Sequence, residues 1–168
     1  LGPLNLLDMS SELRVDRIIP VNGVPNGGGG GIIQMVQGEV TSFLQTSSSS
    51  YVDAGLSASI TPTSSSSKIL VNLALGPYGG DVDTLRVNAQ VLRDSTQVWY
   101  NRDLFFRSGG DFKAVQSGIQ FIDSPETTSS ITYKLQVKCE SVSGGSTFEL
   151  YAANSNYNNR MILMEVSG

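Results

Sequence analysis

One segment of this chain alternates apolar and polar residues with unusual regularity. From Ile131 to Cys139 every odd-numbered residue is apolar and every even-numbered residue is polar. Successive side chains of a strand point to opposite faces, so this period of two gathers the apolar side chains on one face. A helix would scatter them around its circumference. The segment therefore predicts a β-strand with one buried and one hydrated face.

Short β-rich runs separated by turn clusters fill the chain from Ile32 onward. Leu85 to Val91 alternates in the same way, and the turn residues 93–96 then lead into residues 97–100, which predicts a hairpin. No ten-residue window shows the three-and-four spacing of a helix, so we expect at most one short helical turn. The predicted strands cover residues 32–44, 55–61, 68–75, 84–92, 97–100, 104–107, 118–123, 130–140 with 147–152, and 161–166.

Composition and length agree with a single β domain. Only 15% of the residues are charged, and Ser, Thr, Gly and Asn fill most polar positions, which suits strands and turns better than surface helices. A length of 168 residues supports one core. We therefore predict an all-β fold, an antiparallel β-sandwich of the jelly-roll type.

A tract of five glycines, Gly27 to Gly31, divides the chain into two parts. Glycine has almost no conformational preference, so the tract predicts a hinge or tether between an extended N-terminal arm (1–31) and the sandwich (32–168). Prolines 20 and 25 exclude a long helix in the arm. The apolar side chains of the arm are expected to bury against another subunit or a neighbouring protein of an assembly. They belong to Leu13, Val15, Ile18, Ile19, Val21 and Val24.

Charge and hydropathy limit the partners. The net charge is −4, and basic residues are scattered singly, so we expect no nucleic-acid binding. No run of about eighteen apolar residues occurs, so we expect no membrane insertion. The N-terminal residues lack the pattern of a signal peptide, so we expect no secretion.

Catalytic chemistry finds little support in the residue types present. Histidine is absent, which removes the commonest general base and the commonest metal ligand. Cys139 is the only cysteine, and it lies on the apolar face of the predicted strand. This position indicates a small buried apolar residue rather than a nucleophile. The glycine tract is not followed by the Lys-Ser/Thr of a phosphate-binding loop. We predict a protein that is not an enzyme and that carries no cofactor.

Two pairs of carboxylates were weighed as sites. Asp81 and Asp83 could offer oxygens to calcium, but turn formation explains them more simply. Asp123 and Glu126 could form an acid/base pair, but Asp-Ser-Pro-Glu favours a tight turn in which Asp123 accepts bonds from the following backbone amides. We therefore predict no catalytic residue and no metal ligand.

Aromatic and amide residues in predicted loops suggest a binding surface, because such groups commonly meet sugars and protein surfaces. The alternative is that Trp99 and Phe105 or Phe106 fill the core, while the Asn-rich run 154–160 makes a turn. A host surface glycan or protein is the partner that such a surface would contact. The candidate contact residues are Tyr78, Asn154, Asn156, Tyr157 and Asn158.

Four stretches of the sequence resemble a family of virion proteins of tailed bacteriophages, common in cyanophages and other aquatic phages. The stretches are residues 10–20, 56–71, 121–136 and 164–168, and the resemblance covers most of the chain in order. It implies a β-sandwich of the virion, commonly a homotrimer, placed on a tail fibre or on the capsid surface. It brings no catalytic or ligand-binding residues with it.

The function expected on these grounds is that of a structural protein of the virion, made in the host cytoplasm. The arm would attach it to other virion proteins, either in the tail as a tail fibre or tail-associated protein, or on the major capsid protein as a cement or decoration protein. The glycine hinge and the modest length favour decoration slightly, whereas the family resemblance favours the fibre. A carbohydrate-binding module and a hydrolase are the alternatives from other classes.

Overall fold

The structure is a computed structural model, and it describes residues 31–76, 78–79, 84–108, 113–114, 116–142, 145–153 and 158–168. These residues form strands, turns and loops but no helix. The strands are β1 Ile32–Glu39, β2 Leu44–Thr46, β3 Val52–Ile60, β4 Lys68–Leu75, β5 Tyr78–Gly79, β6 Thr84–Arg93, β7 Thr96–Ser108, β8 Lys113–Ala114, β9 Ser117–Asp123, β10 Ile131–Val142, β11 Phe148–Leu150 and β12 Arg160–Val166.

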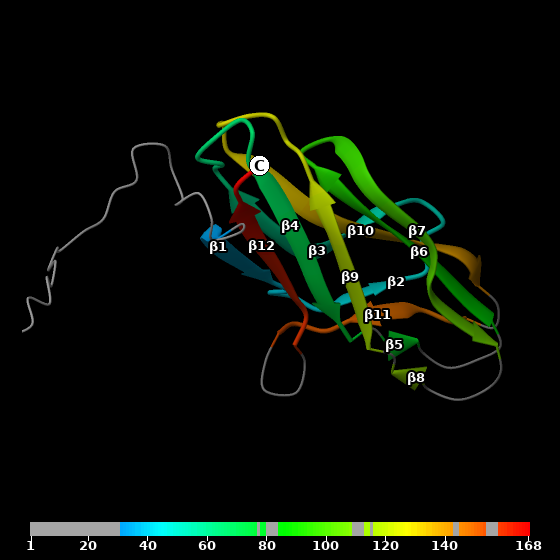
Figure 1. Cartoon of the computed structure of the whole chain (residues 1–168). Coiled ribbons are helices and arrows are strands. Elements are labelled where there is room, and N and C mark those ends of the chain that lie inside the picture. The colour runs from blue at the N-terminus through cyan, green and yellow to red at the C-terminus, as the bar shows by residue number, and fades with distance from the viewer. Residues whose placement is uncertain are drawn as a thin grey trace, which may run out of the picture.

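The longer strands form two antiparallel sheets that face each other (Figure 1). One sheet has the strand order β1-β12-β4-β9 and the other the order β3-β10-β6-β7. The chain passes repeatedly from one sheet to the other, which is the arrangement of a jelly roll, a closed double sheet built from two Greek keys. The prediction of an antiparallel, jelly-roll-like β-sandwich is therefore confirmed for the described residues.

A third, smaller sheet closes one end of the sandwich. Its strand order is β2-β11-β5-β8, and it is built from strands of two or three residues (Figure 1). Phe148 and Leu150 of β11 are buried and belong to the core, so this sheet extends the apolar interior beyond the two main sheets.

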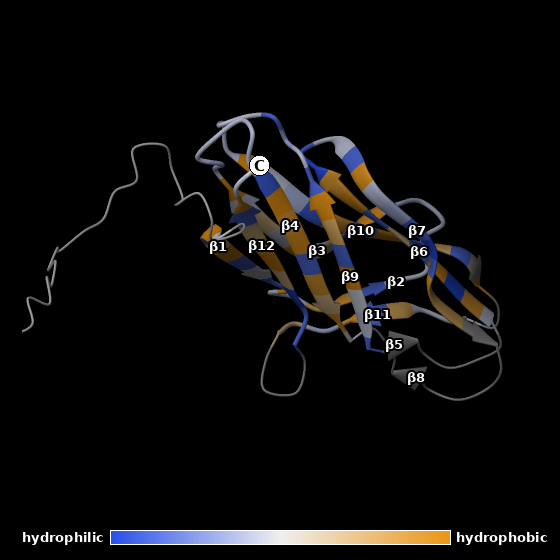
Figure 2. Ribbon diagram, viewed as in Figure 1, coloured by the Kyte–Doolittle hydropathy of each residue, from blue (hydrophilic) through white to orange (hydrophobic). Residues whose placement is uncertain are grey.

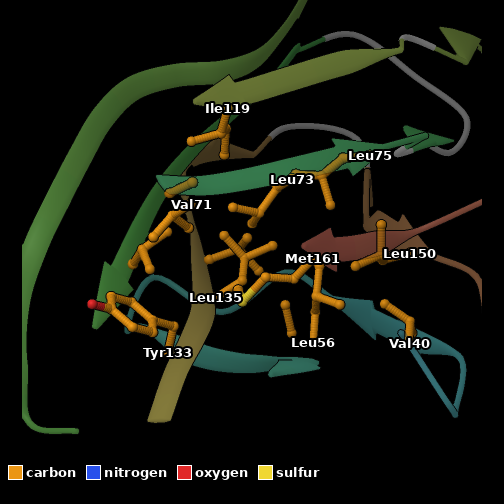
Figure 3. Close-up of a cluster of buried hydrophobic side chains, with 14 of the residues drawn as sticks. Val40, Leu56, Val71, Leu73, Leu75, Ile119, Tyr133, Leu135, Leu150 and Met161 are labelled. Atoms are coloured by element: carbon orange, nitrogen blue, oxygen red, sulfur yellow. The ribbon is translucent and has the colours of Figure 1, made fainter. Parts of the chain in front are cut away.

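The core lies between the two main sheets and follows from the alternation in the sequence. On β10, Ile131, Tyr133 and Leu135 are buried together with Val137 and Cys139, as the period of two predicts. Side chains from β3, β4, β9 and β12 point toward them, as the close-up of the core shows (Figure 3). The burial of Cys139 confirms its interpretation as a core residue.

The edge strands β1 and β3 approach so closely that one position must be glycine. A Cβ atom on Gly38 would lie 1.9 Å from the backbone oxygen of Ser57. Real Cβ atoms never approach a backbone atom that closely, so a side chain at residue 38 would force the two sheets apart. Gly38 therefore allows the sandwich to close along this side.

Several predicted strand limits needed correction. Residues 32–44 contain one strand that ends at Glu39, followed by a separate strand, β2. The predicted strands at 97–100 and 104–107 are one strand, β7, with an irregularity at Asp103, where a positive φ of 61° bends the chain. The hairpin is confirmed: Arg93 pairs with Thr96 across a two-residue turn, and Asp94 has the positive φ that such turns require.

Two runs of serine, residues 47–50 and 64–67, lie in connections between strands, and Ser67 is buried. β1 begins at Ile32, directly after the glycine tract. The arm residues Leu13, Val15, Ile18, Ile19, Val21 and Val24 lie outside the described residues. Within the described part of the chain, no helix could cross a membrane.

Candidate interaction face

The outer face of the β1-β12-β4-β9 sheet carries a row of four apolar side chains. Strand register places Met35 of β1 beside Met164 of β12, Met164 beside Leu70 of β4, and Leu70 beside Ile122 of β9. All four point away from the core, because their neighbours in sequence are the inward-facing residues of each strand. We call these four residues the apolar row.

The ends of the apolar row are the most exposed large apolar side chains of the described residues. Met35 is 63% exposed and Ile122 is 64% exposed, while Leu70 and Met164 are half-buried between them. Ile32, 59% exposed and paired with Val166, continues the apolar surface toward the start of β1. Antiparallel sheets usually turn polar residues to solvent on the face away from the core. This face instead has the composition of a surface that another chain covers.

Hydrophobic segments alternate with polar ones along the strands of this sheet (Figure 2). Residues 161–164 read Met-Ile-Leu-Met, so both phases of β12 are apolar at its centre. Leu70 interrupts the alternation of β4 in the same way. These two departures from period two are the signal in the sequence that marks the apolar row.

A second cross-strand row lies beside the apolar row and is mostly amide. Gln37 pairs with Ile162, Ile162 with Asn72, and Asn72 with Gln120. We call Gln37, Asn72 and Gln120 the amide row. These side chains lie on the same outer face, and side-chain amides offer both hydrogen-bond donors and acceptors. An extended peptide laid over the apolar row would find polar partners for its backbone beside it.

The outer face of the other main sheet, β3-β10-β6-β7, is polar and its groups satisfy one another. Gln90 donates to Gln136 at 2.8 Å, and Gln136 donates in turn to Asp53. Asn88 donates to Glu140 at 2.9 Å, and Arg102 forms an ion pair with the same carboxylate at 2.8 Å. Hydrogen-bonded polar groups therefore dominate this face, although Tyr100 and Phe106 of β7 are also exposed on it.

Electrostatics on the polar face agree with a hydrated surface. The hydrogen bond from Asn88, together with the nearby charge of Arg102, holds the pKa of Glu140 below its ordinary value. Arg86 pairs with Asp103 at 2.8 Å and lies over the ring of Phe106 at 5.2 Å. Charged groups that are paired at the surface need no further partner, so these ion pairs give no reason for cover.

Three polar groups join segments of the sandwich: Asp123 is partly buried, and Glu165 and Asn159 are buried. Asp123 accepts bonds from Tyr133 at 2.6 Å and from Arg93 at 2.7 Å. Glu165 accepts bonds from the backbone and side chain of Thr63, both at 2.7 Å. Buried polar groups persist where such partners satisfy them.

The third buried group is Asn159, which joins the loops at the end of the third sheet. Its Oδ1 accepts a bond from the backbone of Gly76, and its Nδ2 donates to the carbonyl of Tyr151, both at 2.7 Å. The sequence analysis placed Asn159 in an Asn-rich turn. The structure instead buries it completely and makes it a hydrogen-bonding hub.

The structure corrects the interpretation of Asp-Ser-Pro-Glu. Asp123 is the last residue of β9, and its carboxylate accepts bonds from side chains of β6 and β10, not from the backbone amides that follow it. Glu126 stands apart on an exposed segment with a positive φ of 54°. No group of three potential metal ligands occurs within the described ranges.

The aromatic and amide residues singled out in the sequence separate into three groups. Phe105 is buried in the core. Trp99 packs against the core, and its ring is stacked on that of Phe121 with 6.3 Å between the centroids. Phe106 and Tyr100 are exposed. Tyr78 lies in β5, where only its backbone is described, and Asn158 is exposed just before β12. Asn154, Asn156 and Tyr157, like Asp81 and Asp83, lie outside the described residues.

Comparison with known proteins adds the following. No protein-family model matches the chain, and no curated protein matches it. Among solved structures, the insecticidal delta-endotoxin Cry8Ea1 of Bacillus thuringiensis is similar at 17% identity over 80% of this chain and 24% of that one, with a TM-score of 0.42. VP2 of infectious bursal disease virus, solved as a subviral particle, is similar at 15% identity over 80% of this chain and 37% of that one, with a TM-score of 0.45.

The viral particle of the same virus gives 16% identity over 80% of this chain and 35% of that one, with a TM-score of 0.44. The chain thus spans only about a quarter to just over a third of the length of the solved proteins that it matches.

Proposed function

We propose that this chain is a non-enzymatic structural protein of a bacteriophage particle, in which the jelly-roll body is held to its neighbours through an outer sheet face and an N-terminal arm. The observation that carries the proposal is the apolar row, whose ends are nearly two-thirds exposed in the isolated chain. A surface of that composition is stable in water when another protein covers it.

Three further observations support the proposal. The sequence resembles virion proteins of tailed phages over most of its length. The jelly roll recurs in viral capsid proteins, although lectin domains and cupins share it. The chain has no histidine, and its cysteine is buried, so the commonest general base and an accessible thiol nucleophile are missing.

The proposed position is the tail, where the protein would act as a trimeric tail fibre or tail-associated protein attached through its arm. Decoration of the capsid is the second candidate, because the apolar row lies on an open sheet face rather than in a pocket, and such a face suits contact with a broad protein surface. In both positions the polar face of the β3-β10-β6-β7 sheet is free to meet solvent or the host.

Quantitative mass spectrometry of purified particles, combined with antibody labelling under the electron microscope, tests the proposal. Label at the tail with a few copies per particle supports the fibre, and label over the shell with copies in proportion to the capsid protein supports decoration. Absence of the chain from purified particles would overturn the virion function. If a chain that lacks residues 1–31 is incorporated into particles as well as the full-length chain, the arm is not needed for attachment.

A further inference from the structure

We infer that the apolar row binds residues 13–24 from the arm of a second copy of this chain. The inference rests on the proposed function, since it explains how copies join within the assembly. It also identifies the occupant of the outer sheet face, which the strand register alone leaves open.

The need for cover comes from the exposed side chains. Met35 and Ile122 lie at opposite ends of the apolar row and leave 63% and 64% of their surface in water. Burial of an apolar side chain removes its surface from water and so favours the covered state. Cover of the whole apolar row, with Leu70 and Met164 between its ends, is therefore a substantial source of association energy.

The arm supplies matching chemistry. Six of the twelve residues from Leu13 to Val24 are apolar aliphatic, and they precede the glycine tract that leads into β1. β1 is an edge strand, and its first residue, Ile32, is itself exposed beside the apolar row. The arm therefore joins the body at the border of the very surface that lacks a cover.

Backbone hydrogen bonding favours a peptide as the occupant. A peptide covering the apolar row brings N–H and C=O groups out of water, and each such group needs a partner. The amide row, Gln37, Asn72 and Gln120, lies beside the apolar row on the same face and offers such partners. A flat apolar surface of another folded domain would bury these amides without using them.

Assembly favours the arm of a second copy over the arm of the same chain. Twelve extended residues span roughly 40 Å, whereas four strands side by side span only about 14 Å between their outer axes. The segment is therefore longer than the apolar row of any one copy and is long enough to reach a neighbouring copy. Exchange of arms around a closed ring gives each apolar row one occupant and joins the copies, which an arm bound to its own apolar row would not do.

Disulfide trapping between two full-length chains tests this inference. One chain carries Ile122→Cys and a mass tag, and the untagged chain carries Ile18→Cys. The native Cys139 is buried and does not compete. After mild oxidation of the mixture, we expect a tagged–untagged disulfide at least several-fold above that of a control pair with Ser59→Cys, which is exposed on the other main sheet.

A Leu70→Lys substitution in the tagged chain should abolish the excess, because it places a charge in the middle of the apolar row. Cross-linking no greater than that of the Ser59→Cys control would overturn the inference. A disulfide formed only within one chain, in a variant that carries both Ile18→Cys and Ile122→Cys, would overturn it in favour of the chain's own arm.

Sedimentation of the unmodified full-length chain provides a second test. We expect the wild-type chain to be an oligomer. The double variant Met35→Gln/Ile122→Gln should be largely monomeric at micromolar concentration. A wild-type chain that is monomeric, and whose apolar row is covered only in the presence of other particle proteins, would overturn the inference. The proposed virion function would survive that result, because it is decided separately by the composition of purified particles.

Discussion

The hydroxyl group of Tyr133 donates a hydrogen bond of 2.6 Å to Oδ2 of Asp123, and Arg93 donates to the same oxygen at 2.7 Å. Tyr133 and Arg93 belong to one main sheet and Asp123 to the other, so the carboxylate joins the two layers. Burial, and then the bond to Asp123, raises the pKa of Tyr133, which keeps the phenol protonated and able to donate.

Removal of this carboxylate should destabilise the sandwich more than removal of the phenol. Tyr133→Phe deletes one donor and should lower the free energy of unfolding by about 0.5–1.5 kcal/mol. Asp123→Ala leaves the hydroxyl of the buried Tyr133 without an acceptor and also removes the ion pair with Arg93, so it should lower the free energy of unfolding by about 1–3 kcal/mol. Urea unfolding at neutral pH measures both, with Asp53→Ala on the exposed polar face as the control. Equal effects of Asp123→Ala and Asp53→Ala would contradict the structural role.

Glu165 should make the fold sensitive to acid. Burial acts to raise the pKa of Glu165, but hydrogen bonds from partners that include Gln34 and Thr63 outweigh it and hold the pKa below the ordinary value of 4.5. A lowered pKa in the folded state contributes stability that is present above that ordinary value and is lost as the pH falls through the folded pKa. The wild-type chain should therefore lose stability below about pH 4.5.

Glu165→Gln tests this pH dependence. The amide cannot ionise, so the acid-dependent part of the stability should be smaller. It also turns a donor toward Gln34 or Thr63, so stability at neutral pH should fall by about 1–3 kcal/mol. Gln34→Ala removes one donor but keeps the carboxylate, and its acid transition should move to higher pH. If the wild type and Glu165→Gln lost the same amount of stability as the pH falls, the prediction would be contradicted.

Local patterns predicted the strands well because each pattern reports on its own segment. The alternation on β10 correctly placed Tyr133 and Leu135 in the core, since the period of a strand depends on successive residues alone. The outward apolar residues of β4 and β12 were visible as departures from that period, but a departure in one strand does not say what lies beside it.

Cross-strand relationships could not be predicted from local patterns. Met35 and Ile122 share a row only because β12 and β4 lie between β1 and β9 in a definite register. Asp123 was assigned to a turn because Asp-Ser-Pro-Glu is a turn sequence, whereas its partners come from β6 and β10. The candidate interaction face is therefore a product of topology.

Gly38 should be irreplaceable, unlike Gly118 in the strand at the opposite edge of the same sheet. Gly38→Ala would place Cβ 1.9 Å from the carbonyl oxygen of Ser57, so β1 and β3 must separate, and stability should fall by about 1–3 kcal/mol or more. Gly118→Ala in β9 is the matched control, because nothing lies within 4 Å of a Cβ there. Thermal unfolding compares the two, and a Gly38→Ala chain as stable as Gly118→Ala would show that the sheets are not closed at this edge.

The thiol of Cys139 should report on opening of the loop that covers it. The Cys139 side chain is 2% exposed, its Sγ donates to the carbonyl of Thr46 at 3.5 Å, and its backbone N–H donates to the carbonyl of Ser48 at 2.7 Å. Burial raises the pKa of the Cys139 thiol despite an opposing backbone hydrogen bond at Phe148, which lowers the amount of reactive thiolate.

A chromogenic thiol reagent should therefore react with the native chain far more slowly than with the unfolded chain. The rate should rise with urea as the segment 46–48 separates from β10, because reaction requires the thiol to be exposed first. The variant Ser59→Cys has an additional, exposed thiol on the same sheet, and this thiol should consume one equivalent of the reagent at once. If Cys139 in the native chain reacted as fast as this added thiol, the contact between the 46–48 segment and β10 would be absent in solution.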